Sequence, residues 1–443
     1  MEIGDNLSFW LHLWLGIVLL IILVQLIKKT SCGILFAYLT YFGILHWLAA
    51  TFYQIPWYSY FEPRWVLNGL RESTFAALGI AIGSLILAPL LLCVLPFART
   101  AKVQTPDPRL PKTYILTGLV FYFVIVPTLG QLPTLQAITS SGWNLMVVGL
   151  GLTLWKTWHE KKRKKFLIAL LVGFTGLPAL TILTQGFLGF GAVAFLAVFT
   201  FTANFVRPKW QVLLFSLLFG YAAISFYVTY MRDRSLIREM VWGGESSSKR
   251  SNQLLSTVKD FEWFDLSNEK HLRRIDDRLN QNWLLGVSVE ELSSTNDFAY
   301  GETLWDAVLA LIPRVLWPSK PITAGSGGLV TRFTGIPFAE GTSVGIGHVM
   351  EFYVNFGTPS VVIGFIVLGT LVTLFDTYAA RCLRHGDWQG FASWFLPALS
   401  FLNLGGSLVE LTVCLVGSMV LIGFVNKFIL PLLSRKRFQA TRS

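Results

Sequence analysis

The sequence predicts an all-α protein, a polytopic integral membrane helical bundle of about eleven spans with one large outer loop domain of short helices. Hydrophobic residues make up 53% of the 443 residues and charged residues only 14%, whereas soluble proteins carry about 25% charged residues. The apolar residues gather in runs of about 20, the length that a helix needs to cross a bilayer. A single long polar interval, 231–350, separates these runs into two groups.

The apolar runs divide the chain into three parts. The runs assigned as spans are 8–27, 33–53, 75–97, 113–131, 141–157, 166–184, 187–206, 211–230, 355–379, 390–406 and 411–433. The first part is the membrane bundle of the first eight spans, 1–230. The outer loop occupies 231–350, and 351–443 holds the last three spans with a cytoplasmic tail.

The distribution of Lys and Arg predicts the orientation, because short cytoplasmic loops carry an excess of these residues. With the N-terminus outside, the cytoplasmic segments hold 20 of them and the short outer loops hold two, Arg64 and Arg71. Long loops are exempt from this rule, so 231–350 is expected on the outer side. The net charge of +11, including the basic run 161–165, then reflects orientation and contact with anionic lipid, and we expect no nucleic-acid partner.

Several classes of activity lack their sequence signatures. The chain contains no Walker A loop, no GxSxG, no HExxH and no paired CxxC. The four cysteines lie outside 231–350, so we expect no disulfide there, and their spacing makes no metal site. We therefore expect neither a metal nor a cofactor.

The polar interval 231–350 keeps many large apolar side chains, so it is expected to fold as short helices over the mouth of the bundle. The preceding span should continue as a helix over 230–241. Apolar residues recur at helical spacing over 266–292. A short amphipathic helix is expected over 302–312, stopped by Pro313, and the Gly-rich stretch that follows should be loop.

Cationic residues of this interval are candidates for binding a lipid diphosphate, because Arg holds phosphate oxygens through two parallel hydrogen bonds. Arg232 opens the interval where a span ends, and the alternative is an Arg that only reaches the headgroups. Arg314 lies in the proline-bounded segment 310–325, which stiffens its backbone, and the alternative is an ion pair. Lys320 is a further candidate against a solvated Lys, and Arg274 another against a solvated helix network.

His348 and Glu351 are the candidates for proton transfer. They are three residues apart, so they share one helix face at the expected start of the ninth span. Either group could take a proton from an incoming hydroxyl. The alternative is a capping or packing pair at a helix start. Glu302 and Glu340 are further carboxylates of the same interval.

The overall layout and one short segment resemble a known family. The segment contains Pro313, Arg314, Trp317, Pro318, Lys320 and Pro321. Together with a polytopic bundle and a large basic outer loop, it resembles the bacterial oligosaccharide repeat-unit polymerases of the Wzy or O-antigen polymerase type. The signature of that family is Arg, ten residues, then Gly, and the pairs Arg314–Gly325 and Arg232–Gly243 have this spacing.

The resemblance implies a metal-independent glycosyltransferase. It would join repeat units carried on undecaprenyl diphosphate into a surface polysaccharide, at the periplasmic side of the bacterial inner membrane. Arg314 would stabilise the departing diphosphate, and His348 or Glu351 would act as the general base. The other residues expected to contact the diphosphate or the glycan are Arg232, Arg274, Lys320, Trp317, Gly325 and Glu302. The expected partners are the lipid-linked oligosaccharide, the bilayer and a polysaccharide chain-length regulator.

Two other functions fit part of this pattern. An O-antigen ligase-like transferase has the same layout and needs nearly the same residues. A transporter or flippase of lipid-linked oligosaccharides would need charged residues deep in several spans. Such charges are scarce, since Asp376 and Lys427 lie near the inner ends of their spans.

Overall fold

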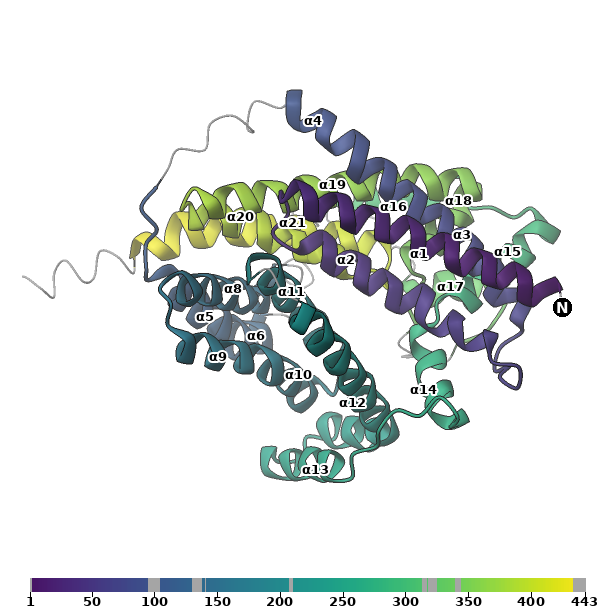
Figure 1. The fold of residues 1–443 in the computed structure, drawn as a ribbon, viewed down its shortest axis with the longest axis horizontal. Coiled ribbons are helices and arrows are strands. Elements are labelled where there is room, and N and C mark those ends of the chain that lie inside the picture. Colours follow the sequence, from purple (N-terminus) through teal and green to yellow (C-terminus); the bar gives the residue numbers. More distant parts are fainter. Residues whose placement is uncertain are drawn as a thin grey trace, which may run out of the picture.

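The structure, a computed structural model, describes residues 2–94, 104–129, 138–139, 141–206, 210–312, 317, 325–338 and 344–432. All regular elements of these residues are helical and none is a strand, so the all-α prediction is confirmed. Long helices from both ends of the chain, α1, α2, α3, α19 and α21, lie along the long axis of the molecule, while α5 and α8 to α10 form a second group at one end (Figure 1). The short helices α15 to α18 lie at the other end (Figure 1).

Eight helical stretches of the described residues are long and apolar enough to cross a membrane, which indicates a membrane protein. They are Asn6–Lys28, Ile34–Gln54, Pro63–Val94, Leu110–Leu129, Arg163–Gln185, Leu188–Val206, Thr358–Arg384 and Leu408–Leu432. The three remaining predicted spans are not among the stretches that are long and apolar enough to cross a membrane. The spans 141–157 and 390–406 correspond to the shorter helices α8 (Asn144–His159) and α20 (Trp388–Ala398), and 211–230 lies within α12 (Trp210–Trp242).

The bounds of the other elements follow the chain. The elements before α12 are α1 (Glu2–Lys28), α2 (Ile34–Gly43), η2 (Ala49–Gln54), α3 (Pro63–Ile82), α4 (Ala88–Val94), α5 (Leu110–Val120), α6 (Val126–Leu129), η6 (Ser141–Trp143), α9 (Arg163–Leu171), α10 (Leu177–Gln185) and α11 (Leu188–Val206). Those after it are α13 (Ser247–Lys259), α14 (Glu269–Leu279), α15 (Asn282–Thr295), α16 (Glu302–Leu309), α17 (Ser326–Thr334), α18 (His348–Phe356), α19 (Thr358–Arg384), η8 (Leu399–Leu402) and α21 (Leu408–Phe424). Five-residue π-helical turns interrupt the long apolar helices at η1 (Ile44–Leu48), η3 (Gly83–Leu87), η5 (Phe121–Ile125), η7 (Val172–Gly176) and η9 (Val425–Ile429).

Small residues allow α3 to pack closely against its neighbours. A Cβ at Gly79 would lie 2.6 Å from the carbonyl oxygen of Val362 in α19. Without side chains at such crossings, two backbones approach closely enough for extensive van der Waals contact, which drives the association of apolar helices in lipid. The same device joins α3 to α15, where a Cβ at Gly286 would overlap the carbonyl oxygen of Trp65.

Substitution of Gly286 by alanine is expected to destabilise the protein by about 1–3 kcal/mol, because the added methyl group overlaps the backbone of α3. Thermal unfolding of the purified protein in detergent measures this loss. Gly327→Ala is the matched control, since its Cβ would meet nothing within 4 Å in α17. That control should leave the unfolding temperature unchanged or raise it. Equal effects of the two variants would contradict the close approach.

Asp376 has a structural task at one end of the bundle. Its Oδ1 accepts hydrogen bonds from the backbone N–H groups of Cys32 (2.9 Å) and Ile34 (3.1 Å). These donors lie at the start of α2, where backbone N–H groups have no partner within the helix. The carboxylate therefore caps α2 and ties it to α19.

The polar interval contains more helix than the sequence predicted. The expected continuation over 230–241 is confirmed by α12, and the helix expected over 302–312 is α16, which ends at Leu309. The Gly-rich stretch was expected to be loop, and that expectation is wrong for α17. Leu329, Val330 and Phe333 of this helix are buried, so burial of an apolar face outweighs the low helix propensity of its glycines.

The helical spacing over 266–292 corresponds to two helices, α14 and α15, because the chain breaks between them. Asn280, at the break, has an extended backbone. Its side chain accepts a hydrogen bond from the backbone N–H of Asn282 (3.0 Å) and donates one to Asp276 (2.6 Å). An Asn side chain that bonds nearby groups in this way competes with helix continuation.

The sequence predicted that His348 and Glu351 lie at the start of the ninth span, and this prediction is wrong. They lie on the separate helix α18, which ends at Phe356 and is followed by Gly357. This glycine has φ 66° and ψ −155°, a conformation that is essentially restricted to glycine. Helix α19 starts directly after it. The break places the two side chains ahead of the membrane-length helix rather than within it.

Candidate functional site

Two of the arginines predicted to bind a diphosphate are paired with a carboxylate of the polar interval. Arg232 donates to Glu262 (2.8 Å) and to the adjacent Asp233 (2.8 Å). Arg274 donates to the other oxygen of Glu262 (2.8 Å), and His271 lies 3.3 Å from that oxygen. Burial alone would raise the pKa of Glu262, but the hydrogen bonds from Arg232 and Arg274 lower it to about 2. This Glu262 cluster neutralises both arginines, and their contact with a ligand stays a prediction.

Three other arginines gather where helices α12 and α14 approach each other. We call Arg234 and Arg238 of α12 and Arg278 of α14 the arginine cluster. Arg278 pairs with Asp277 at 3.0 Å. Arg234 makes no hydrogen bond or ion pair with any residue that the structure describes. Partial burial lowers the pKa of the Arg234 guanidinium, and the positive charges of Arg278 and Arg238 lower it further.

Helical spacing creates this cluster. Arg234 and Arg238 are four residues apart, so they share one face of α12. Arg238 is held in place, because its Nε lies 3.3 Å from the carbonyl oxygen of Gly186 and its guanidinium lies 4.1 Å from the ring centre of Phe187. Tyr227, seven residues before Arg234 on this face, lies close enough to Arg234 and Arg278 to feel their charges. The face therefore combines cations and a hydroxyl donor.

The electrostatics of the arginine cluster favour an anion. Its members carry three positive charges, and among the described carboxylates only Asp277 is paired with one of them. Like charges held together in a partly buried place repel each other strongly, because the surrounding dielectric is low. A phosphate group would relieve this repulsion and could accept charge-assisted hydrogen bonds from the guanidinium groups.

His348 and Glu351 form a buried pair with unused hydrogen-bonding atoms. Both side chains are at most 1% exposed. One oxygen of Glu351 accepts the backbone N–H of Leu408 (2.6 Å), at the start of α21. The other oxygen and both ring nitrogens of His348 bond to no described atom. An unpaired buried polar atom costs about 1–3 kcal/mol, so these atoms are expected to find partners beyond the described residues.

Burial sets the protonation states of this pair. It lowers the pKa of His348 to about 4 and raises the pKa of Glu351 to about 8. At neutral pH the imidazole is therefore neutral and can accept a proton. The carboxyl group is protonated and can donate one. This difference assigns distinct chemical capacities to two residues that the sequence treats as equivalent candidates.

The polar groups around the pair come from α16, α17 and α21. Asn355 donates to Thr303 of α16 (2.7 Å) and to the carbonyl oxygen of Glu351 (2.6 Å). Glu410 at the start of α21 accepts a hydrogen bond from Ser326 (2.9 Å), the first residue of α17. These bonds fix the short helices around α18.

The predicted site residues fall into separate places. Gly325 directly precedes α17, next to Ser326, so it lies on the same side of the molecule as the pair. Glu302 begins α16 and pairs with Arg332 (2.8 Å). Trp317 is half-buried. Arg314, Lys320 and Glu340 lie outside the described residues.

The α14–α15 junction connects the arginine cluster with the His348–Glu351 pair. The side chain of Gln281 lies against Gly347, directly before His348. Arg278 precedes Gln281 by three residues, and three residues span at most about 10 Å. The backbone of Arg278 therefore lies within about 10 Å of the residue that contacts Gly347. A substrate that joins an anion to a hydroxyl-rich group could contact both the arginine cluster and the pair.

Sequence reasoning missed the arginine cluster as a site. Its members were visible only as part of a general excess of cations in the polar interval. The available signal was the four-residue spacing of Arg234 and Arg238 on one helix face. Among the described residues, no group of three or more His, Cys, Asp or Glu side chains could hold a metal ion.

A family model described as "Domain of unknown function (DUF8712)" matches residues 80–429. The chain belongs to this family. The DUF8712 region starts inside α3 and ends at η9, so it contains the arginine cluster, the Glu262 cluster and the His348–Glu351 pair. No curated protein matches the chain, and no solved structure does.

Proposed function

We propose that this DUF8712 protein is a membrane glycosyltransferase that joins lipid-diphosphate-linked oligosaccharide repeat units into a surface polysaccharide. The carrier is undecaprenyl diphosphate, and the polar interval 231–350 faces the periplasmic side of the bacterial inner membrane. The arginine cluster carries this proposal, because it contains an arginine that pairs with no described residue and lies across one junction from a buried acid–base pair. The resemblance of the chain's layout to repeat-unit polymerases supports it.

The arginine cluster binds the diphosphate of the donor. During transfer, the bond between the anomeric carbon and the diphosphate oxygen breaks, and its electron pair stays on the diphosphate. Guanidinium groups that are already in place stabilise the charge that develops there. Arg314 and Lys320 lie outside the described residues and stay candidates for contact with the same diphosphate.

His348 accepts the proton of the acceptor hydroxyl. The pKa of Glu351 is about 8, so this carboxyl is mostly protonated at neutral pH, and we assign the base to His348. The pKa of His348 is about 4, so its ring is neutral and has a free lone pair. The acceptor oxygen bonds to the anomeric carbon as its proton moves to the imidazole, and the lipid diphosphate leaves. Glu351 positions the acceptor through its unpaired oxygen.

The lipid-linked products of a deletion strain test the proposed function. Loss of the polymer ladder, with single repeat units retained on the lipid, is the expected result. Complementation with the wild-type chain should restore the ladder. Accumulation of full-length polymer on the lipid would instead indicate a ligase, and single units trapped on the cytoplasmic side would indicate a flippase. Either outcome would overturn the polymerase assignment.

A further inference from the structure

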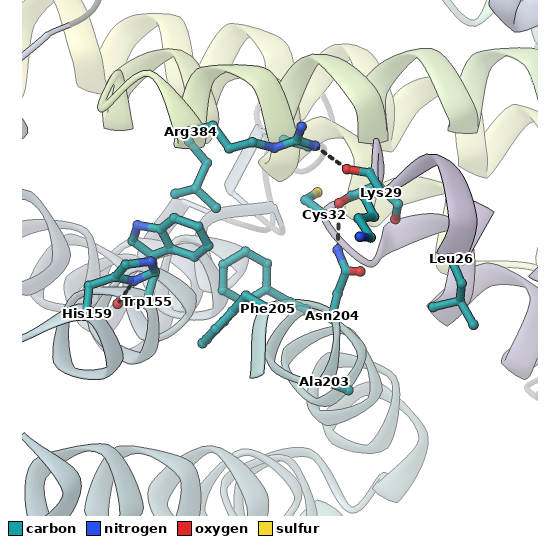
Figure 2. A pocket seen from close by; sticks show the side chains of 13 residues that line it. Leu26, Lys29, Cys32, Trp155, His159, Ala203, Asn204, Phe205 and Arg384 are labelled. Atoms are coloured by element: carbon teal, nitrogen blue, oxygen red, sulfur yellow. Dashed lines mark hydrogen bonds between the residues drawn. The ribbon is translucent and has the colours of Figure 1, made fainter. Parts of the chain in front are cut away.

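A cavity of about 670 Å³ lies at the end of the bundle where α1, α8, α11 and α19 end and α2 begins (Figure 2). Its volume falls in the range of small-molecule sites, about 300–1,000 Å³. Three of these helices belong to stretches of membrane-spanning length that end here, at Lys28, Val206 and Arg384. The cavity is therefore at the depth where lipid headgroups meet the hydrocarbon core.

The polar side of the cavity is cationic. Lys29 and Arg384 line it, and none of the described lining residues is Asp or Glu. The guanidinium of Arg384 donates to the carbonyl oxygen of Lys29 (2.9 Å), as Figure 2 shows. The ammonium group of Lys29 bonds to no described residue. Asp376 lies near, but its Oδ1 is occupied by the backbone N–H groups at the start of α2.

The remaining wall is aromatic and apolar. The indole of Trp155 packs edge-on against Phe205, with ring centres 5.2 Å apart. His159 packs beside Trp155 with a tilted ring, the ring centres 4.1 Å apart, and its Nδ1 lies 2.8 Å from the carbonyl oxygen of that residue. Leu26 lies across the cavity from these rings (Figure 2). The site thus joins two cations to an apolar surface that an acyl chain could cover.

We infer that this cavity is a binding site for an anionic phospholipid, independent of the transfer reaction at the other end of the bundle. The phosphodiester lies between Lys29 and Arg384, and the acyl chains follow the wall formed by Trp155, Phe205 and Leu26. Charge complementarity selects an anionic headgroup, since the described lining holds Lys29 and Arg384 and no carboxylate, while the nearby Asp376 offsets only part of this charge. The apolar wall selects an amphiphile over free phosphate.

The substitution Lys29→Asn tests the lipid site, because it removes one of its two cations. Lys29 has φ 53°, a left-handed conformation that Asn tolerates better than Lys, so the variant is expected to fold at least as well as the wild type. Lys161→Asn is the matched control. Lys161 lies in the turn after α8, has φ 55°, carries the same charge, and does not line the cavity.

The experiment measures the melting temperature of the purified full chain in detergent during titration with short-chain phosphatidylglycerol. Phosphatidylcholine of the same chain length and inorganic phosphate are titrated in parallel. Phosphatidylglycerol should raise the melting temperature of the wild type and of Lys161→Asn at the same concentrations. Lys29→Asn should need a concentration about fivefold higher, the effect of losing one cation near a phosphate.

Two further measurements complete the test. Native mass spectrometry should detect phosphatidylglycerol retained by the wild type and lost from Lys29→Asn. Arg384→Gln should lose the lipid while Arg384→Lys keeps it. Equal weakening in Lys29→Asn and Lys161→Asn would mean diffuse surface charge and overturn the inference. Equal protection by phosphatidylcholine would overturn the anionic selectivity, and equal protection by inorganic phosphate would overturn the lipid assignment.

Discussion

Replacement of Arg234 by alanine is expected to remove about 99% of polymer formation without lowering the stability of the protein, because one preorganised charge-stabilising donor contributes about 100-fold to the rate. Arg234 makes no hydrogen bond or ion pair with the described residues, so truncation breaks no such contact. It also relieves repulsion from Arg238 and Arg278. Polymer made by the complemented deletion strain and the melting temperature of the purified variant measure the two effects.

Arg232→Ala is the matched control, two residues away on the same helix. Arg232 pairs with Glu262 and Asp233, so its loss leaves carboxylates without a partner and should cost about 1–3 kcal/mol of stability. Arg234→Lys should retain part of the activity, since Lys supplies charge without the two-pronged geometry of Arg. Wild-type amounts of polymer in Arg234→Ala would contradict the assignment of the arginine cluster as the diphosphate-binding site. Loss of polymer in Arg232→Ala at unchanged stability would restore the assignment made from the sequence.

The stability of the protein is expected to fall between about pH 6.5 and pH 8 because of Glu351. The ordinary pKa of Glu is near 4.5, and burial raises that of Glu351 to about 8. In this window the folded state keeps a proton that the unfolded state has released. Stability therefore decreases as the pH rises, by about 1.4 kcal/mol for each pH unit.

His348 contributes a slope of the opposite sign at lower pH. Burial lowers its pKa from 6.5 to about 4, so between these values the unfolded state binds the extra proton. Stability from this residue rises with pH across that window. Between about pH 4.5 and pH 6.5 the opposite effects of His348 and Glu351 on stability cancel. The contribution of this pair to stability should therefore not change with pH in that range.

Glu351→Gln separates the two contributions. The variant keeps an oxygen for the N–H of Leu408 but no longer titrates. The stability of this variant should stay constant as the pH rises above 6.5. It should decrease as the pH falls below 6.5, because His348 alone then titrates. Urea unfolding in detergent from pH 4.5 to pH 8 measures both profiles, and the double variant with His348→Gln should lack both slopes. Parallel profiles for the wild type and Glu351→Gln would show that Glu351 is ionised in the folded state.

Local features were predictable where the physical cause is itself local. The length and composition of apolar runs predict helices, and eight of the predicted spans correspond to helices of membrane-spanning length. The extension of α12 past residue 230 and the position of α16 also follow from local pattern. In contrast, the break at Asn280 depends on bonds to Asp276 and Asn282 that helix periodicity does not reveal. Helix α17 forms despite its glycines because the rest of the protein buries one face of it.

The sequence by itself determined an all-α, strongly basic membrane protein with a polar interval that holds cations and an acid–base pair. Only the tertiary structure decided which of these groups are used within the protein. Glu262 neutralises Arg232 from 30 residues away, while Arg234, two residues further along the same helix, has no such partner among the described residues. Packing buries His348 and Glu351 together and shifts their pKa values in opposite directions. The physical reason is that charge pairing and desolvation depend on distances in space, which the order of residues along the chain does not specify.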